Sequence, residues 1–130
     1  MKKYVLKKSG ALYYTKAAVK GVTGILNVDL LIDTGATYTL FPVESLEMYG
    51  YDIVASKEKV RLITASGFIL APKIKVQWLQ VLDCKFNFFP VVAHTLPPEM
   101  YFKGILGMDF IKQARAVIDI FQGEIEIHAR

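Results

Sequence analysis

The chain contains one segment whose residue types and order suit acid–base chemistry. Asp33-Thr34-Gly35 directly follows the apolar run Leu30-Leu31-Ile32, which predicts a carboxylate at the end of a buried strand. Taking a charged group out of water is costly unless the charge is paired, so an ionisable side chain at this position needs a reason. Asp33 is therefore the candidate catalytic residue.

The chemistry that suits Asp33 needs a second carboxylate. Two carboxylates at hydrogen-bond distance cannot both ionise, so they share a proton and titrate as a coupled pair. One then removes a proton from a water molecule while the other protonates the carbonyl oxygen under attack, which hydrolyses an amide without a covalent intermediate. Because the chain has only one such segment, the second carboxylate is expected from a second copy of the chain.

The residues beside Asp33 fit this role, and they also fit a simpler one. Gly35 permits a tight turn and close approach of a substrate backbone, and the Thr34 hydroxyl is able to hydrogen-bond to a facing loop. Alternatively, Asp-Thr-Gly is only a turn, in which Asp33 forms an Asx-turn and Gly35 supplies a positive φ. A strictly monomeric protein would favour this second interpretation.

Period-two alternation and turn residues predict a mostly β chain, a small barrel with one or two short helices. The expected strands are residues 4–6, 12–19, 25–32, two strands within 59–82 around Ser66-Gly67, 86–92 with a break at Pro90, 116–121 and 124–128. The expected helices and irregular connection are residues 42–49, a segment from Met108 or Asp109 toward Ala114, and Leu96-Pro97-Pro98. Charges on one side of the 59–82 hairpin predict that it is half buried.

Length and composition limit the class of protein. The 130 residues fit a single domain spanning 1–130, and 53% hydrophobic with 22% charged residues predicts a globular chain. The net charge of +4 comes from scattered lysines without interleaved aromatic residues, which favours a solvated face over a nucleic-acid site. No apolar run has the length of a membrane span and no signal peptide is recognisable, so a cytoplasmic location is expected.

The other chemically capable residues are interpreted as structural, and no metal or cofactor is expected. Cys84 is the only cysteine and lies in a predicted turn without a neighbouring base, which argues against a nucleophile or a thiolate cluster. His94 and His128 lack metal-ligand spacing and are expected on the surface. Asp109 is expected to favour a helix N-terminus rather than to take part in catalysis.

Three segments, in this order, resemble the retropepsin-like aspartic proteases, the single-domain relatives of the pepsins. The first is Leu31-Ile32-Asp33-Thr34-Gly35-Ala36-Thr37-Tyr38-Thr39 and the second is Ile63-Thr64-Ala65-Ser66-Gly67, which is similar to the tip of the family's flap. The third is Gly104-Ile105-Leu106-Gly107-Met108-Asp109-Phe110-Ile111. Order and spacing agree over most of residues 10 to 128.

The resemblance implies a closed barrel that forms a symmetric homodimer and cleaves a peptide or protein substrate. Each subunit would contribute Asp33, with Thr34, Gly35, Ala36 and Thr37 in the active-site loop. Residues Thr64, Ala65, Ser66 and Gly67 would form the flap over the cleft. Ile105, Leu106 and Gly107 would pack beside the loop and support it.

Two departures from the viral members favour the non-viral branch of the family. In viral members acidic residues usually follow Asp-Thr-Gly-Ala, whereas this chain has Thr37-Tyr38 there. Viral members also tend to have Arg after the second apolar-apolar-Gly step, where this chain has Met108. Ala36 replaces the Ser found in many two-domain relatives, which predicts activity at less acidic pH. The alternative function is a non-catalytic peptide-binding or oligomerisation module with the same fold.

Overall fold

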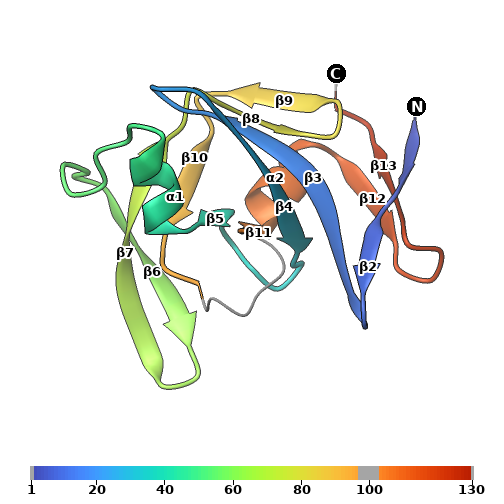
Figure 1. The fold of residues 1–130 in the computed structure, drawn as a ribbon. Helices are drawn as coiled ribbons and strands as arrows, with labels where there is room; N and C mark the ends of the chain where they lie inside the picture. Colours follow the sequence, from blue (N-terminus) through green and yellow to red (C-terminus); the bar gives the residue numbers. More distant parts are fainter. Residues whose placement is uncertain (1, 97–102, 130) are drawn as a thin grey trace.

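The computed structural model of the chain describes residues 2–96 and 103–129, and strands make up most of it (Figure 1). The expected connection at Pro97-Pro98 lies outside the described residues. The strands are β1 (Lys3–Val5), β2 (Lys7–Ser9), β3 (Leu12–Lys20), β4 (Ile25–Ile32), β5 (Leu40–Phe41), β6 (Lys59–Thr64), β7 (Gly67–Lys75), β8 (Trp78–Val81), β9 (Cys84–Asn87), β10 (Pro90–Ala93), β11 (Ile105–Leu106), β12 (Ala116–Asp119) and β13 (Glu124–Ile127). The helices are α1 (Val43–Met48) and α2 (Met108–Gln113).

Most strands belong to one curled sheet, with the order β6-β7-β10-β5-β11-β4-β3-β8-β9 and with β2 added beside β3. A second sheet has the order β1-β13-β12. The mostly β class is therefore confirmed. Closure of the barrel is not, because the outer strands β6 and β9 do not pair with each other within the described part of the chain.

Strand β11 lies at the centre of the large sheet and joins distant parts of the sequence. It runs parallel to β4, with Ile105 opposite Leu31 and Leu106 opposite Ile32, and antiparallel to β5. Gly104 is needed beside this strand, because a Cβ there would lie 2.6 Å from Leu30 Cδ2 and 2.7 Å from the Leu40 carbonyl oxygen. The close packing brings the end of β4 next to the start of α2.

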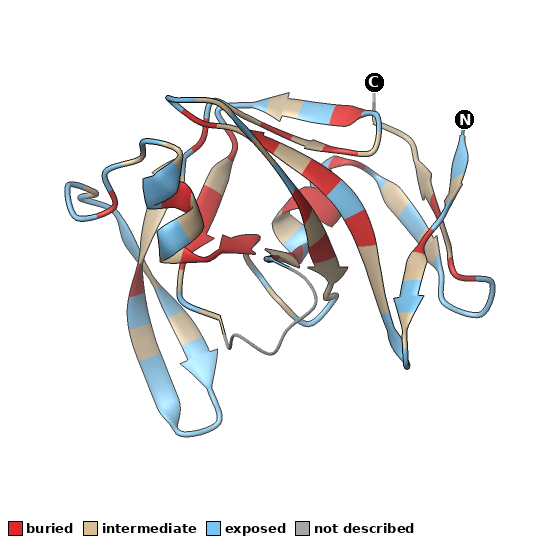
Figure 2. Ribbon diagram, in the orientation of Figure 1, coloured by how far each residue is buried: buried red, intermediate tan, exposed pale blue. Residues whose placement is uncertain are grey.

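The hydrophobic core lies between the curled sheet and α2, as the red segments in Figure 2 show. Phe41, Leu30 and Phe110 are essentially inaccessible to solvent. The Phe110 ring packs against Phe86 and Phe89, with ring centroids 5.0 and 5.3 Å apart. Burying an aromatic side chain of this size stabilises the fold by about 2 kcal/mol or more, so α2 is firmly anchored beneath the sheet.

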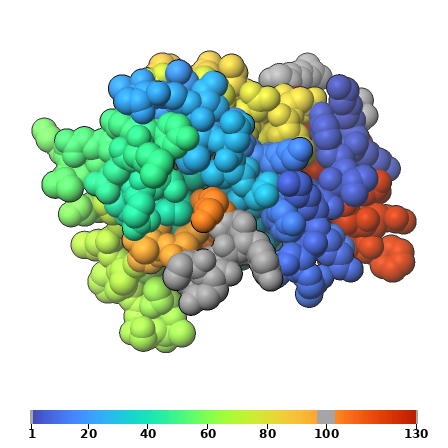
Figure 3. All heavy atoms as spheres, viewed as in Figure 1, coloured from blue at the N-terminus to red at the C-terminus, as the bar shows by residue number. Residues whose placement is uncertain are grey.

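The hairpin of β6 and β7, which we call the flap hairpin, projects away from the body of the molecule (Figures 1 and 3). Its inner face, with Leu62 and Ile69, is partly buried. Its outer side carries the exposed Lys59 and Arg61, as expected, together with two apolar residues, Ile63 and Phe68, which are 81% and 50% exposed. Exposure alternates along β6, so the prediction of a hairpin with one partly buried and one exposed side is confirmed for this strand.

Two further expectations near residue 80 need correction. The second strand expected within 59–82 is two strands, β7 and β8, which pair with β10 and β3 respectively. Cys84 does not lie in a turn: it begins β9 and is buried, while the turn comes one step earlier at Leu82, which has a positive φ of 57°. A period-two pattern cannot reveal this break, because Val76 is apolar and the alternation continues through it.

The two ends of the chain pair with each other. In the small sheet Tyr4 of β1 lies opposite Ile125 of β13, and Ile118 of β12 lies opposite the same residue. The nearby Asp83 carboxylate, as a hydrogen-bond acceptor and a negative charge, raises the pKa of Tyr4 to about 12. The sequence left open whether these strands pair within one subunit, and here they do.

Candidate active site

Asp33 is the first residue after β4, at the point where β4 and β11 run side by side. The Asp33 N–H donates to the Leu106 carbonyl oxygen (N···O 3.1 Å), which fixes the backbone at the end of the strand. The Ala36 N–H donates back to the Asp33 carbonyl oxygen at 3.1 Å and closes a turn. The candidate carboxylate is thus held by a rigid part of the sheet, as the sequence predicts.

Gly35 orients the Asp33 carboxylate. The Gly35 N–H donates to Asp33 Oδ1 at 2.9 Å, which is the hydrogen bond of an Asx-turn. The positive φ expected for Gly35 under the simple-turn interpretation is not observed. Glycine instead fits here because it is small: a Cβ at this position would lie 3.3 Å from Asp33 Oδ1. One carboxylate oxygen is therefore held in place, while Thr34 and Gly35 are exposed.

A hydrogen-bonded brace between Thr39 and Asp109 ties the active-site loop to α2. Asp109 Oδ1 accepts from Thr39 Oγ1 at 2.7 Å, and both Asp109 carboxylate oxygens lie within 3.0 Å of the Thr39 backbone nitrogen. Thr39 Oγ1 in turn accepts from the Gly107 N–H at 3.1 Å. Thr39 is fully buried, so these bonds satisfy polar groups that water cannot reach.

The brace adds to the role expected for Asp109. Its Oδ1 also accepts from the Phe110 N–H at 2.7 Å, which agrees with a position at the start of a helix. The contact with Thr39 was missed, because the two residues are 70 positions apart and no local pattern links them. The Met108 and Asp109 N–H groups also donate to the Ala36 and Thr37 carbonyl oxygens. The loop thus rests on the first turn of α2.

Gly107 allows this contact, and replacing it should loosen the site. A Cβ at Gly107 would lie 2.4 Å from the Tyr38 carbonyl carbon, which is backbone and cannot move aside easily. We expect Gly107→Ala to lower the free energy of unfolding by about 2 kcal/mol or more, because overpacking forces backbone shifts. Gly10→Ala is the control: Gly10 has open space but a φ of +60°, so about 1 kcal/mol is expected. Equal losses in urea unfolding would contradict the packing argument.

A cleft of about 350 Å³ lies between the Asp33 loop and the flap hairpin. Asp33, Gly35, Ala36 and Thr37 line it, as expected from the sequence. Of the predicted flap residues, Thr64 lines the cleft, whereas Ala65, Ser66 and Gly67 do not. Of the predicted supporting residues, Ile105 reaches the cleft, while Leu106 and Gly107 pack behind it.

Several residues of the cleft were not predicted as site residues. They are Tyr38, Leu40, Arg61, Leu62, Ile63, Ile69 and His94. The turn of the hairpin is Ala65-Ser66, one residue earlier than the expected Ser66-Gly67, and it places Leu62 opposite Ile69 on one face. His94 was expected to be an ordinary surface residue, but its backbone N–H donates to the Phe41 carbonyl oxygen, which places it at the cleft. The lining is mainly apolar around one carboxylate.

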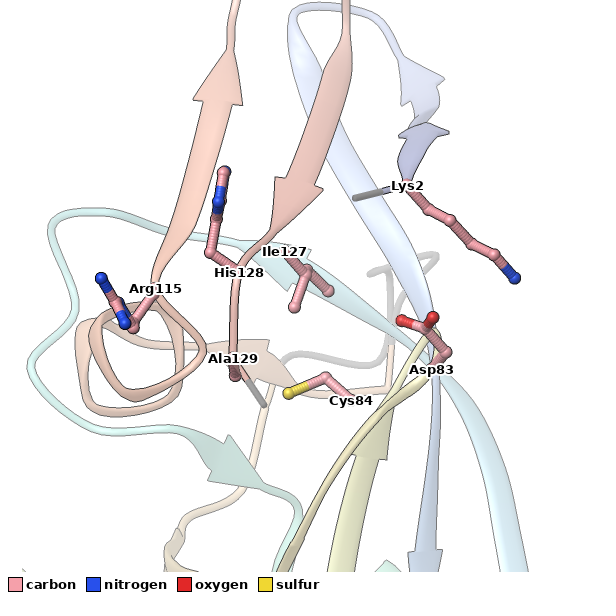
Figure 4. A pocket seen from close by; sticks show the side chains of 7 residues that line it. All are labelled: Lys2, Asp83, Cys84, Arg115, Ile127, His128 and Ala129. Atoms are coloured by element: carbon pink, nitrogen blue, oxygen red, sulfur yellow. The ribbon is translucent and has the colours of Figure 1, made fainter.

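A larger hollow of about 510 Å³ near the chain ends does not have the features of a catalytic centre (Figure 4). It contains Cys84, whose thiol pKa is raised by burial and, secondarily, by the charge of Asp83. A thiol with a raised pKa is a poor nucleophile. Figure 4 shows the His128 ring directed away from Cys84, so no base accompanies the sulfur.

The described residues contain neither a side-chain cluster suited to a metal ion nor a membrane-spanning helix. In residues 2–96 and 103–129 no group of three or more His, Cys, Asp or Glu side chains is placed to hold a metal ion. No helix in the same ranges has the length and apolar character to cross a membrane.

Comparisons with known proteins agree with the geometry. A sequence profile described as "Aspartyl protease" matches residues 15–110, which is most of the chain. A solved structure, a retropepsin-like aspartic protease from Rickettsia conorii, superposes with a TM-score of 0.70 at 17% identity and covers 96% of this chain and 98% of that one. No curated protein matches. The chain therefore belongs to the aspartyl protease family and has a retropepsin-like fold.

Proposed function

We propose that the protein is an aspartic endopeptidase that acts as a homodimer, with Asp33 of each subunit forming the catalytic pair. The observation that carries this proposal is the position of the Asp33 carboxylate, which lines the cleft with one oxygen held by the Gly35 N–H. The exposed Thr34 and Gly35 leave room for a second loop. We further propose that residues 1–130 act as one domain in the cytoplasm, on peptides or proteins and without a cofactor.

The mechanism follows from the coupled pair. One Asp33 carboxylate is ionised and removes a proton from a water molecule, while the protonated partner donates to the carbonyl oxygen of the scissile amide. Ala36 and Ile105 supply an apolar floor, and Leu62 and Ile69 of the flap hairpin cover the substrate from above. The substrate would lie in the cleft as an extended strand, because such a strand offers backbone groups to the loop and the hairpin.

The same observations are compatible with a peptide-binding module that does not cleave, and one experiment separates the two functions. Incubation of the protein with a peptide library at mildly acidic to neutral pH should give cleavage products that pepstatin suppresses. Products that persist in pepstatin would point to a contaminating peptidase of another class. Peptide binding without products, at protein concentrations where a dimer is present, would favour the binding module.

Ala36 should set the working pH of the enzyme. Ala36 lines the cleft floor, and a hydroxyl at this position would be able to donate to the charged form of the dyad. Because such a donor stabilises the charged form, we expect Ala36→Ser to move the pH–rate profile for peptide cleavage toward lower pH. Ala55→Ser, in an exposed segment, is the control and should leave the profile unchanged. A shift toward higher pH in Ala36→Ser would contradict the argument.

A further inference from the structure

We propose that one end of the curled sheet docks on the surface of an anionic lipid bilayer. The docking surface, which we call the apolar edge, consists of four side chains: Val22, Ile25, Trp78 and Phe88. Lysines surround these side chains on the same face of the sheet. The proposal goes beyond the peptidase activity proposed above and does not depend on it.

The register of the sheet brings the apolar edge together from distant parts of the sequence. Lys20 of β3 lies opposite both Ile25 of β4 and Trp78 of β8, so these three side chains share one row on the outer face of the sheet. Trp78 also lies opposite Asn87 of β9, and Phe88 follows directly. The turn between β3 and β4 and the connection from β9 to β10 adjoin at the upper edge of the molecule (Figures 1 and 3).

Hydrogen bonds hold the apolar edge in one shape. The Phe88 N–H donates to the Gln77 carbonyl oxygen at 2.9 Å, and the Gln77 N–H donates to the Tyr51 hydroxyl oxygen at 2.8 Å. The same Tyr51 hydroxyl donates to the Lys20 carbonyl oxygen. Phe88 has a φ of +53°, which a bulky residue rarely adopts. Backbone strain of this kind is typical of functional segments, so the position of Phe88 needs an explanation beyond folding.

The apolar edge is open to water along most of its surface. Phe88 is 69% exposed, Val22 in the β3–β4 turn is 60% exposed and Ile25 is 47% exposed, while Trp78 is half-buried beside them. A single exposed apolar side chain is ordinary on a protein surface. A group of adjoining ones marks a surface that binds another molecule or a membrane.

The charge around the apolar edge identifies an anionic partner. The outer face of β3, β4, β8 and β9, which the structure describes in full, carries Lys16, Lys20 and Lys85, and none of the ion pairs among the described residues involves these three lysines. Asp29 is the one carboxylate on this face of the four strands, and Lys7 pairs with it at 3.2 Å. The face therefore has an excess of positive charge.

A bilayer accounts for both the apolar and the basic residues. Apolar side chains enter the boundary between headgroups and acyl chains, Trp favours that boundary, and lysines reach the anionic headgroups. Single-stranded nucleic acid would use the lysines and would stack its bases on Trp78 and Phe88. It would leave the aliphatic Val22 and Ile25 in water, so the lipid surface is the better partner.

Docking through the apolar edge would leave the candidate active site free. Ile25 begins β4 and Asp33 follows its last residue, so the two positions lie at opposite ends of an eight-residue strand. A strand of this length spans about 25 Å. The cleft would then face away from the bilayer and stay open to substrate.

The first test measures co-sedimentation of the protein with vesicles. The wild type should bind vesicles of phosphatidylcholine with phosphatidylserine, bind far less to phosphatidylcholine alone, and bind less as salt is raised, because salt screens the lysines. Phe88→Asn should lower the vesicle partition coefficient at least about tenfold, since it removes a large apolar side chain. Asparagine tolerates a positive φ, so the turn should persist. Phe121→Asn is the matched control, because Phe121 is 93% exposed in the β12–β13 turn, outside the apolar edge.

A second pair of variants tests the charge. Joint replacement of Lys20 and Lys85 by Gln should lower the partition coefficient for phosphatidylserine vesicles about tenfold or more, because each lysine near an anionic surface contributes to binding. Joint replacement of Lys3 and Lys112 by Gln is the control, since both are exposed and lie on β1 and α2. Circular dichroism verifies that all variants are folded.

The outcomes separate the possible partners of the apolar edge. Losses in Phe88→Asn and in the Lys20 and Lys85 variant, but not in the two controls, support the proposal. A wild type that does not bind phosphatidylserine vesicles at low salt overturns it, and so does wild-type binding by folded Phe88→Asn. Two other results also overturn it: binding of a labelled single-stranded oligonucleotide without binding of vesicles, and a dimer in solution that Phe88→Asn dissociates.

Discussion

Asp33→Asn should abolish peptide hydrolysis while the protein stays folded. The asparagine amide keeps an oxygen that accepts the Gly35 N–H at the present 2.9 Å, so the loop should keep its shape. An amide cannot take up or release the proton that the reaction requires, and both subunits of the dimer carry the change. We expect kcat/KM for a peptide substrate to fall by about 10³-fold or more.

The matched control for this variant is Asp29→Asn, because Asp29 lies on β4, the strand that leads to Asp33. Asp29 forms a partly exposed ion pair with Lys7, with 3.2 Å between Lys7 Nζ and Asp29 Oδ1. Surface ion pairs contribute at most about 1 kcal/mol, so this variant should fold and cleave as the wild type does. If Asp33→Asn kept full activity, Asp33 would be an ordinary turn residue. If both variants lost activity together, the loss would reflect the strand rather than the carboxylate.

Asp109→Ala should cause the largest loss of stability among the substitutions considered. The change removes the acceptors for the Thr39 N–H and hydroxyl and for the Phe110 N–H, and it leaves the buried Thr39 without its charged partner. Hydrogen bonds to charged groups contribute about 1.5–3 kcal/mol, and a buried donor without a partner adds a further cost. We expect the free energy of unfolding to fall by about 3 kcal/mol and the Tm by about 10 °C.

Asp52→Ala is the control for the brace. Asp52 Oδ1 accepts a single backbone hydrogen bond from Ala55 in an exposed turn, at 3.2 Å, so its removal should cost well below 1 kcal/mol in the same thermal scan. Asp109→Asn keeps one acceptor oxygen, so its Tm should lie between those of Asp109→Ala and Asp52→Ala. A Tm of Asp109→Ala equal to that of Asp52→Ala would mean that the brace does not stabilise the loop.

The parts of the fold that depend on local patterns could be predicted from the sequence. Strand β4 has the bounds that the apolar run indicated, and Asp33 follows it at the sheet edge. The helix expected over 42–49 is α1, with Pro42 as its N-cap and Gly50 at a positive φ after it. These features follow from residues that are neighbours in the chain, so propensity and turn chemistry are sufficient to identify them.

The parts that depend on distant contacts could not be predicted. The insertion of β11 between β4 and β5 is set by packing around Gly104, and the brace joins Thr39 to Asp109 across the whole fold. The direction of the flap hairpin is another example. Ile63 shares the exposed side of β6 with Arg61, as the alternation predicts, but the direction in which the hairpin projects does not follow from that pattern. The family resemblance supplied the order of these segments and the packing of Ile105, Leu106 and Gly107 beside the loop, but not the brace.

The insertion of β11 also determines when the Asp33 loop gains its supporting hydrogen bonds during synthesis of the chain. The N-terminal part through Thr39 is made early, yet the bonds that hold its loop come from Leu106, Gly107 and Asp109. Contacts over such separations form only after the intervening chain exists, and their formation is intrinsically slow. A nascent chain on the ribosome therefore carries the Asp33 segment without its support until nearly the whole sequence has emerged.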